Sequence, residues 1–482
     1  MRKILIKNIK YIVTCDDKDN LIQEGFIYIE DGVIQKIGSL DGQPENCNFS
    51  DKKINEDKVS KNKVTKNKLS ENKVDEIIDG RDMIVYPGLI NTHHHLYQYF
   101  TRNLPQVQNL ELFPWLKTLY EIWKNIDEET IRYSSLLGMG ELMKNGCTTC
   151  FDHHYVFPDK TGSRLIDVQF EAADQLGIRL HASRGSMDLS VKDGGLPPDS
   201  VVQDIDSILK DSERLVKQFH RNEKGSKRQV ALAPCSPFSV SADLLKESAV
   251  LARSLGVRLH THLAETLDEE KYTLEKYNMR PLEYMRRLGW LGEDVWFAHG
   301  IYFNGEELKL LSETGTGVAH CPISNMKLSS GIAKIPEMLK LKVPVGLAVD
   351  GSASNDGSNL LEEIRVAYLL HCLNSSKDAP SGYDLLKVAT KGSASILGRN
   401  DIGQLAVGKM ADLFMIDSNN PELTGADYDP KSMLATVGIK GNAALTMIGG
   451  EVVVRDGKLA LIDEEKAAKK GRQAVNRLMN HF

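Results

Sequence analysis

A repeating pattern of apolar and polar segments covers most of the 482-residue chain. An apolar, β-branched run is followed by a polar or reactive cluster, and then by a segment with helical spacing. Short apolar runs of this kind are typical of buried parallel strands. Eight such runs follow one another: MIVYPGLINTHHH, CTTCFDHHY, IRLHASRG, QVALAPCS, VRLHTHLAET, VWFAHG, TGVAHCP and VPVGLAVDGS.

The stretches between these runs have the spacing of amphipathic helices. Apolar residues stand at i, i+3, i+4 and i+7 in EETIRYSSLLGMGELMKNG, SADLLKESAVLARSLG and NLLEEIRVAYLLHCL. Several stretches begin with Ser, Asp or Asn and end at Gly, which are residues that start and stop helices. Eight consecutive strand–helix units predict an α/β fold, a closed parallel (β/α)8 TIM barrel, over residues 86–395.

Both ends of the chain have the pattern of β structure instead. Short strands with Gly and Asp-Gly turns fill residues 1–85, and strands return within residues 396–482 in ADLFMID and LTMIGGEVVVRDGKLA. We expect the two ends to form one small β-sandwich domain. The final charged segment, EEKAAKKGRQAVNRLMNHF, is expected to form a surface helix.

Residues 51–73 interrupt the N-terminal strands with a segment rich in Lys and Asn. The segment has almost no bulky apolar residues, so it cannot bury enough surface to offset the entropy of ordering it. We interpret it as an exposed insert, and an interaction tail is the alternative.

Composition limits the function classes. The net charge of -6 provides no basic footprint for nucleic acid. Lysines break up the apolar residues of the N-terminus, so neither a signal peptide nor a membrane helix is expected.

Seven sparse cysteines fit reduced thiols in a cytoplasm. Cys147 and Cys150 form a CxxC without a second pair, which we interpret as two buried thiols. We expect a cytoplasmic homo-oligomer.

Reactive residues cluster at the C-terminal ends of the predicted barrel strands, where barrel enzymes place their active sites. Side chains alternate along a strand, so His93 and His95 point the same way while His94 points away. His262 ends the fifth strand and Asp350 the eighth. Three imidazoles and a carboxylate with room for water are typical of a catalytic zinc or iron site. Unrelated core histidines are the alternative, which the shared strand-end position disfavours.

Two further polar residues stand beside this set. Glu265 follows His262 in HLAET, where a carboxylate near an activated water can carry a proton. His299 ends the sixth strand and can hydrogen-bond the same water. A purely structural role is the alternative for each.

Several of these motifs resemble the amidohydrolase superfamily: PGLINTHHH, HLAET, AHG, VDGSASNDGS and VGKMADLFMID. Within the superfamily they are similar to the branch of deaminases and s-triazine hydrolases. Longer strings, among them NTHHHLYQYFTR, LAPCSPFSV and HTHLAETLDEE, resemble bacterial 8-oxoguanine deaminases. The resemblance covers nearly the whole chain except the insert.

The resemblance implies the same ligand set, namely His93, His95, His262 and Asp350. It also places Glu265 and His299 at the reacting water. Two-metal members of the superfamily carry a carboxylated lysine at the end of the fourth strand, where this chain has APCSP. The expected cofactor is therefore one divalent metal ion, zinc, with iron as the alternative.

The substrate pocket is predicted in less detail. Gln98 matches a position that guanine deaminases use to contact the ring edge, and Arg184 follows the third strand, where it can bind a ring carbonyl. Trp115 and Tyr155 can stack on or border an aromatic ring, with a core position as the alternative. Cys235 is interpreted as a packing thiol.

The predicted reaction is hydrolytic deamination of a purine-like heterocycle. Hydroxide attacks the ring carbon that bears the exocyclic amine, Glu265 protonates the neighbouring ring nitrogen, Asp350 accepts the hydroxide proton, and ammonia leaves. The resemblance favours 8-oxoguanine, which would give urate. Isoxanthopterin or guanine is the alternative substrate, and removal of an alkylamine or chloride from an s-triazine is another. The complete ligand set disfavours a non-catalytic binding protein.

Overall fold

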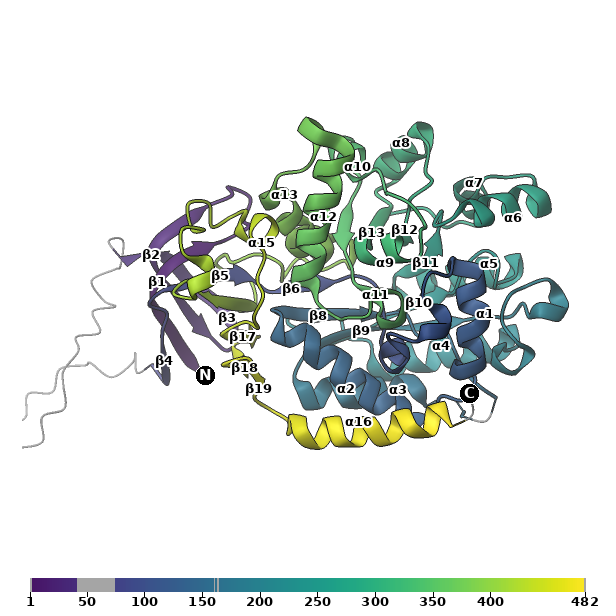
Figure 1. Cartoon of the computed structure of the whole chain (residues 1–482), viewed down its shortest axis with the longest axis horizontal. Helices are drawn as coiled ribbons and strands as arrows, with labels where there is room; N and C mark the ends of the chain where they lie inside the picture. The colour runs from purple at the N-terminus through teal and green to yellow at the C-terminus, as the bar shows by residue number, and fades with distance from the viewer. Residues whose placement is uncertain (1, 41–73, 160, 163, 481–482) are drawn as a thin grey trace, which may run out of the picture.

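The computed structural model describes residues 2–40, 74–159, 161–162 and 164–480, so the expected insert over 51–73 lies outside the described residues. Eight parallel strands form the barrel sheet, in the spatial order β14-β13-β12-β11-β10-β9-β8-β6 (Figure 1). They are β6 (Leu89–Asn91), β8 (Cys147–Asp152), β9 (Arg179–Ser186), β10 (Arg228–Pro234), β11 (Leu259–Leu263), β12 (Val295–His299), β13 (Gly317–His320) and β14 (Val345–Leu347).

The two edge strands of this sheet meet and close the barrel. The backbone N–H of Thr92, directly after β6, donates to the carbonyl of Leu347 on β14 at 3.2 Å. Just beyond this point a short pair of strands, β7 (His94–His95) and β15 (Asp350–Gly351), continues the contact in parallel. The expected (β/α)8 barrel is confirmed, and its first and last strands end side by side.

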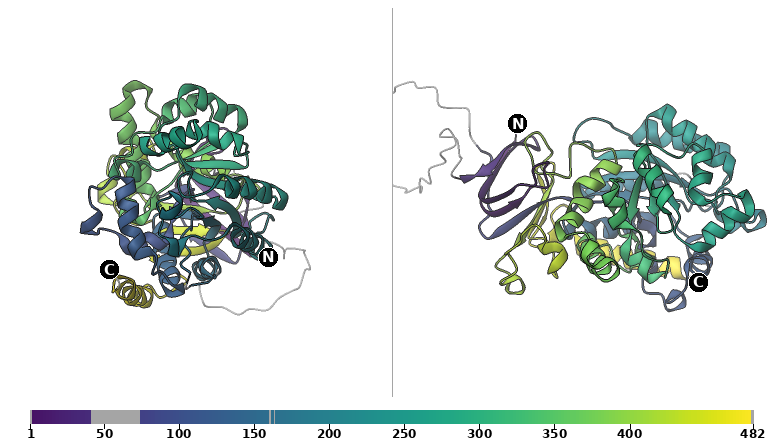
Figure 2. Two further views of the ribbon diagram at one scale, coloured as in Figure 1. Left: turned by 90° about the vertical axis from the view of Figure 1, so that its right-hand side faces the viewer. Right: turned by 90° about the horizontal axis from the view of Figure 1, so that it is seen from above.

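Helices cover the outside of the barrel (Figure 2). The main ones are α1 (Leu112–Trp123), α2 (Glu128–Lys144), α3 (Leu165–Leu176), α4 (Ile205–Phe219), α5 (Ala242–Leu255), α6 (Leu267–Tyr277), α7 (Pro281–Arg287), α8 (Gly305–Thr314), α9 (Pro322–Lys327), α10 (Ile335–Lys340), α12 (Leu360–Ser375) and α13 (Gly382–Lys387). The expected surface helix at the C-terminal end is α16 (Glu464–Met479), which runs along α2 (Figure 1).

The helices start and stop where the sequence signals predict. Asn304 and Glu307 form a capping box at the start of α8, and Gly315 ends that helix with φ of 70°. Ser241 caps α5 by accepting from the N–H of Leu244, and Gly256 ends it with φ of 68°. These side chains satisfy backbone groups that have no partner within the helix, and glycine adopts the left-handed ending without strain.

A second sheet combines strands from both ends of the chain, as expected. Its order is β19-β18-β17-β16-β5-β1-β2-β3, with β4 also paired to β1. The N-terminal members are β1 (Lys3–Val13), β2 (Leu21–Glu30), β3 (Val33–Ser39), β4 (Glu76–Asp79) and β5 (Met83–Pro87); the C-terminal members are β16 (Leu413–Asp417), β17 (Leu445–Ile448), β18 (Glu451–Arg455) and β19 (Lys458–Leu459). The sheet has a separate apolar core rich in isoleucine from β1 and β2.

The run MIVYPGLIN, expected to be one strand, is divided between the two sheets. Residues Met83–Pro87 pair within the small sheet as β5, and the barrel starts with β6 at Leu89. Gly88 lies between them, and a Cβ atom there would stand 2.3 Å from the side chain of Thr148. The chain therefore crosses between the sheets at Gly88, a position that only glycine fits.

A buried ion pair joins the barrel to the small sheet. Arg179, at the start of β9, donates from Nε and Nη2 to the two carboxylate oxygens of Asp412 at 2.7 and 2.9 Å. Asp412 immediately precedes β16 and also accepts from the backbone N–H of Gly449. Both charged side chains are 1% exposed. Removing one partner of such a pair leaves an uncompensated buried charge.

We expect Arg179→Met to lower the free energy of unfolding by about 3–5 kcal/mol, because Asp412 would remain buried without its partner. The matched control is Arg228→Met, which breaks an exposed pair with Asp174 and should cost about 0–1 kcal/mol. Thermal and denaturant unfolding of the two variants measure the difference. Equal destabilisation of the two variants would show that the buried ion pair does not stabilise the contact between the barrel and the small sheet.

Candidate active site

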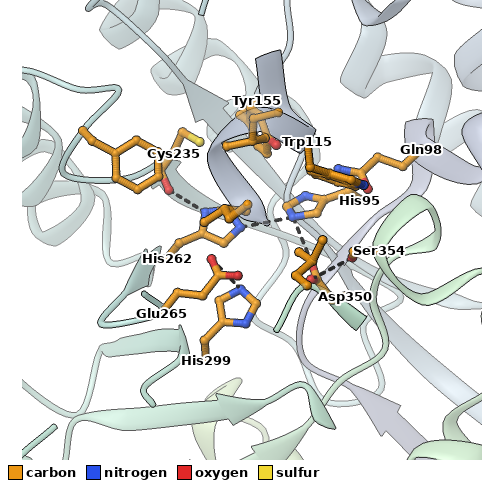
Figure 3. Close-up of a pocket in the computed structure, with 14 residues that line it drawn as sticks. His95, Gln98, Trp115, Tyr155, Cys235, His262, Glu265, His299, Asp350 and Ser354 are labelled. Carbon is orange, nitrogen blue, oxygen red and sulfur yellow. Dashed lines mark hydrogen bonds and ion pairs between the residues drawn. The ribbon is translucent and has the colours of Figure 1, made fainter. Parts of the chain in front are cut away.

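A cavity lies among the loops at the C-terminal ends of the barrel strands (Figure 3). Cavities of this kind, mostly apolar with a few convergent polar groups, are typical of small-molecule sites. Its walls are formed by His95, Gln98, Leu112, Trp115, Leu116, Tyr155, Cys235, Phe238, His262, Glu265, His299, Leu328, Asp350 and Ser354. Strands β7, β11, β12 and β15 supply His95, His262, His299 and Asp350, and Glu265 follows β11.

The four residues expected to hold the metal converge beside this cavity. Oδ1 of Asp350 lies 3.2 Å from Nε2 of His93 and 3.3 Å from Nε2 of His95. Nε2 of His262 lies 3.1 Å from Nε2 of His95. His94 points away, as alternation predicts, and its Nε2 lies 3.0 Å from the hydroxyl of Ser358.

The hydrogen bonds of two imidazoles show that a cation fits between them. Nδ1 of His95 lies 2.6 Å from the carbonyl of His153, and Nδ1 of His262 lies 2.6 Å from the carbonyl of Cys235. A carbonyl only accepts, so each Nδ1 carries a proton, and in a neutral ring this leaves Nε2 bare. Two bare nitrogens 3.1 Å apart beside a carboxylate can share a positive ion as ligands, which removes the repulsion between them.

Burial keeps the rings of His93 and His262 unprotonated, and metal binding requires unprotonated rings. Burial lowers the pKa of His262 to about 3 and holds the pKa of His93 well below its ordinary value. Both rings are therefore neutral near pH 7 and can donate a lone pair to a metal. Nε2 of His93 is buried and has no hydrogen-bond partner among the described residues. The donor set thus fits one divalent ion.

Glu265 and His299 form a second pair at the edge of the cluster. Oε2 of Glu265 lies 3.5 Å from Nε2 of His299, and Oε1 accepts from the hydroxyl of Ser330 at 3.2 Å. Burial raises the pKa of Glu265 despite the opposing effect of His299. Burial alone would lower the pKa of His299, but the carboxylates of Glu265 and Asp350 raise it. A carboxyl with a raised pKa is suited to carrying a proton.

The backbone at these positions is strained. His299 and Asp350 have φ of 72° and 62°, in the left-handed region that favours glycine. Such a conformation costs about 1–3 kcal/mol and persists only where the surroundings impose it. The hydroxyls of Ser324 and Ser354 hold Asp350 by donating to Oδ2 at 2.5 and 3.0 Å. The left-handed backbone conformation turns both side chains into the cavity at the point where each strand ends.

Three of the four expected substrate residues line the cavity, namely Gln98, Trp115 and Tyr155. The structure does not bring Arg184 there. Its guanidinium is buried, donates to Asp211 at 2.6 Å and to the carbonyl of Gly185, and lies 3.8 Å over the ring of Phe157. The acceptor at Asp211 on α4 draws the side chain away from the cavity.

Sequence reasoning missed two groups that support the site. Glu269 accepts from the backbone N–H groups of Ala264 and Glu265 at 2.9 and 3.1 Å, which fixes the loop that carries Glu265. His260 lies 2.8 Å from His93. The same HxH alternation that singled out His93 and His95 also occurs at His260 and His262, and it could have identified His260.

The CxxC cysteines are buried thiols, as interpreted from the sequence. Cys147 and Cys150 are both free and lie within β8. Burial raises the pKa of the Cys147 thiol to about 12 and that of the Cys150 thiol well above its ordinary value. Neither is a reactive thiolate near neutral pH.

In the part of the chain that the structure describes, no helix has the length and apolar character of a membrane span.

The barrel and its His/Asp cluster define the class of a metal-dependent hydrolase. Comparison with known proteins agrees with that class. The model of the amidohydrolase family matches residues 84–453. The chain belongs to the amidohydrolase family.

Individual relatives share both sequence and fold with the chain. It is 45% identical to an 8-oxoguanine deaminase of Pseudomonas aeruginosa over 83% of this chain and 89% of the relative. It is 43% identical to hydroxydechloroatrazine ethylaminohydrolase of Pseudomonas sp. strain ADP, over 82% of each chain. The structure of atrazine chlorohydrolase from Arthrobacter aurescens TC1, solved with zinc, has a TM-score of 0.88 at 31% identity and covers 98% of this chain and 100% of that one.

Metal analysis of the purified protein is expected to find about one divalent ion per chain, and much less in His93→Ala, because that variant removes one of four convergent donors. The control is His94→Gln, which keeps a donor toward Ser358 on the side of the strand away from the cluster and should retain the ion. A fully active protein without metal, or equal loss in both variants, would contradict the assignment.

Proposed function

We propose that the chain is a hydrolytic deaminase of a purine-like heterocycle, and that its substrate is 8-oxoguanine, which it converts with water to urate and ammonia. The observation that carries this proposal is the 45% identity to an 8-oxoguanine deaminase over most of both chains, in a chain whose described residues include His/Asp groups that could hold a metal ion. The expected cytoplasmic location and homo-oligomeric state remain predictions.

The proposed cofactor is one zinc ion, with iron as the alternative, held by His93, His95, His262 and Asp350. A divalent ion in such a site acts as a Lewis acid and lowers the pKa of water toward neutrality. The set has no lysine donor, because β10 ends at Pro234 and is followed by Cys235. We therefore propose one ion rather than a two-metal centre.

Proton transfer is assigned to the carboxylates of the chain. Glu265 faces the cavity and has a raised pKa, so it can protonate the ring nitrogen next to the carbon under attack. Asp350 accepts the proton of the attacking water. His299 lies beside Glu265 with its Nδ1 2.8 Å from the side-chain oxygen of Asn325, which orients Nε2 toward the attacking oxygen. The proton held by Asp350 then passes to the amine, which leaves as ammonia.

Two unpaired polar groups in the cavity support recognition of a ring with polar edges. Oε1 of Gln98 and Nε1 of Trp115 are buried without a partner among the described residues. Gln98 packs directly on Gly351, where a Cβ atom would stand 1.9 Å from Oε1. We propose that Gln98 accepts from a ring N–H, that Trp115 donates to a ring acceptor or stacks on the ring, and that Tyr155 borders it. For Arg184 we propose a structural role.

Glu265→Gln keeps the size of the side chain and removes the proton carrier. We expect the metal content to be retained and kcat to fall by at least ~100-fold, the usual scale for the loss of a general acid–base. The control is Glu270→Gln, since Glu270 is on α6 in a pair with Arg280. A Glu265→Gln rate close to that of the unmodified enzyme would show that another group carries the proton.

Substrate choice is tested by comparing kcat/KM for 8-oxoguanine, guanine, isoxanthopterin and a hydroxylated s-triazine. We expect 8-oxoguanine to be preferred over guanine, because guanine lacks the second carbonyl and has a bare acceptor where 8-oxoguanine has an N–H. Leaving buried polar groups of the site unpaired costs about 1–3 kcal/mol each. Equal or better turnover of guanine or the triazine would overturn the named substrate and leave the family assignment intact.

A further inference from the structure

A layer of ring side chains fills the barrel interior directly beneath the metal cluster. His260 on β11 stacks on Trp296 of β12, with ring centroids 4.5 Å apart at 28°. Phe151 of β8 packs edge-on against both rings at 4.8 Å. Because β8 is not a neighbour of β11 or β12, these contacts cross the inside of the barrel. All three side chains are fully buried, so the position of the His260 ring is fixed by packing.

The ring of His260 lies in a chain of hydrogen bonds that ends at the metal cluster. Its Nδ1 is 2.9 Å from the carbonyl oxygen of Trp296, and its Nε2 is 2.8 Å from Nδ1 of His93. The carbonyl can only accept, so Nδ1 of His260 carries a proton. In the neutral ring Nε2 is then an acceptor, and His93 must donate to it from Nδ1.

These two tautomers leave the lone pair of His93 on Nε2, the atom that lies 3.2 Å from Asp350. The opposite tautomers would set a bare Nδ1 of His260 against the carbonyl of Trp296. They would also place the proton of His93 on Nε2, in the metal cluster. His95 and His262 are oriented by backbone carbonyls directly. His93 is oriented through a second imidazole.

We propose that His260 is a positioning residue for the metal site: it holds His93 in the tautomer and orientation that present Nε2 to the ion. His260 does not touch the ion or the substrate. Partners that orient a ligating histidine in this way typically change metal affinity by about 10–100-fold when they are removed. The role should therefore appear in metal affinity itself, apart from turnover.

The experiment compares three variants by competition for Zn²⁺ with a chromophoric chelator. His260→Leu removes the acceptor for His93 and should raise the Kd for zinc by about 10–100-fold. His260→Gln places an oxygen where it can accept from His93, and its Kd should stay within a few-fold of the unmodified protein. The control is His181→Leu, because His181 packs against the same Phe151 and Trp296 but bonds to none of the metal ligands.

The proposal is overturned if His260→Leu binds zinc as tightly as the unmodified protein. It is also overturned if His260→Gln and His260→Leu weaken binding equally, or if His181→Leu weakens it as much, since packing alone would then explain the loss. Should His260→Leu fail to fold, the zinc-loaded unmodified protein labelled with 15N-histidine provides a separate test. Ring proton–nitrogen correlations should place the His260 proton on Nδ1, and a proton on Nε2 would overturn the proposal.

Discussion

The imidazoles of His95 and His262 face each other through bare Nε2 atoms 3.1 Å apart, with the carboxylate of Asp350 beside them. When both rings are neutral, their protons are donated to backbone carbonyls on the other side, and the two Nε2 atoms both act as acceptors. A cation between the two rings removes the repulsion between these two atoms. A rigid scaffold must hold the rings in place, and the barrel does so because each carbonyl partner comes from the end of another strand.

The same constraint explains where the structure is strained and where glycine is needed. His299 and Asp350 adopt left-handed backbone conformations that turn their side chains into the cavity. Ser324 and Ser354 hold Asp350 in that position, and Gly351 leaves room for Gln98. The strained backbone is thus confined to the strand ends. The large apolar core and the closed ring of strands supply the stability that offsets this strain.

Much of this site could be predicted from the sequence because it depends on local periodicity. The alternation that separates His93 and His95 from His94 and the eight strand–helix repeats both follow from backbone geometry. The position of Arg184 could not be predicted, because its place depends on Asp211 in a helix that follows. The crossing at Gly88 depends on Thr148, which is distant in sequence. Long-range contacts decided each of these cases.

The metal ligands and the proton carriers converge at one cavity, so we expect catalysis to require one ion and no more. The most direct measurement is a titration of metal-stripped protein with Zn²⁺ while ammonia release from 8-oxoguanine is followed. We expect activity to be absent at first, to rise in proportion to added zinc and to reach its plateau at one equivalent per chain. Activity without metal, or a plateau that requires two equivalents, would contradict it.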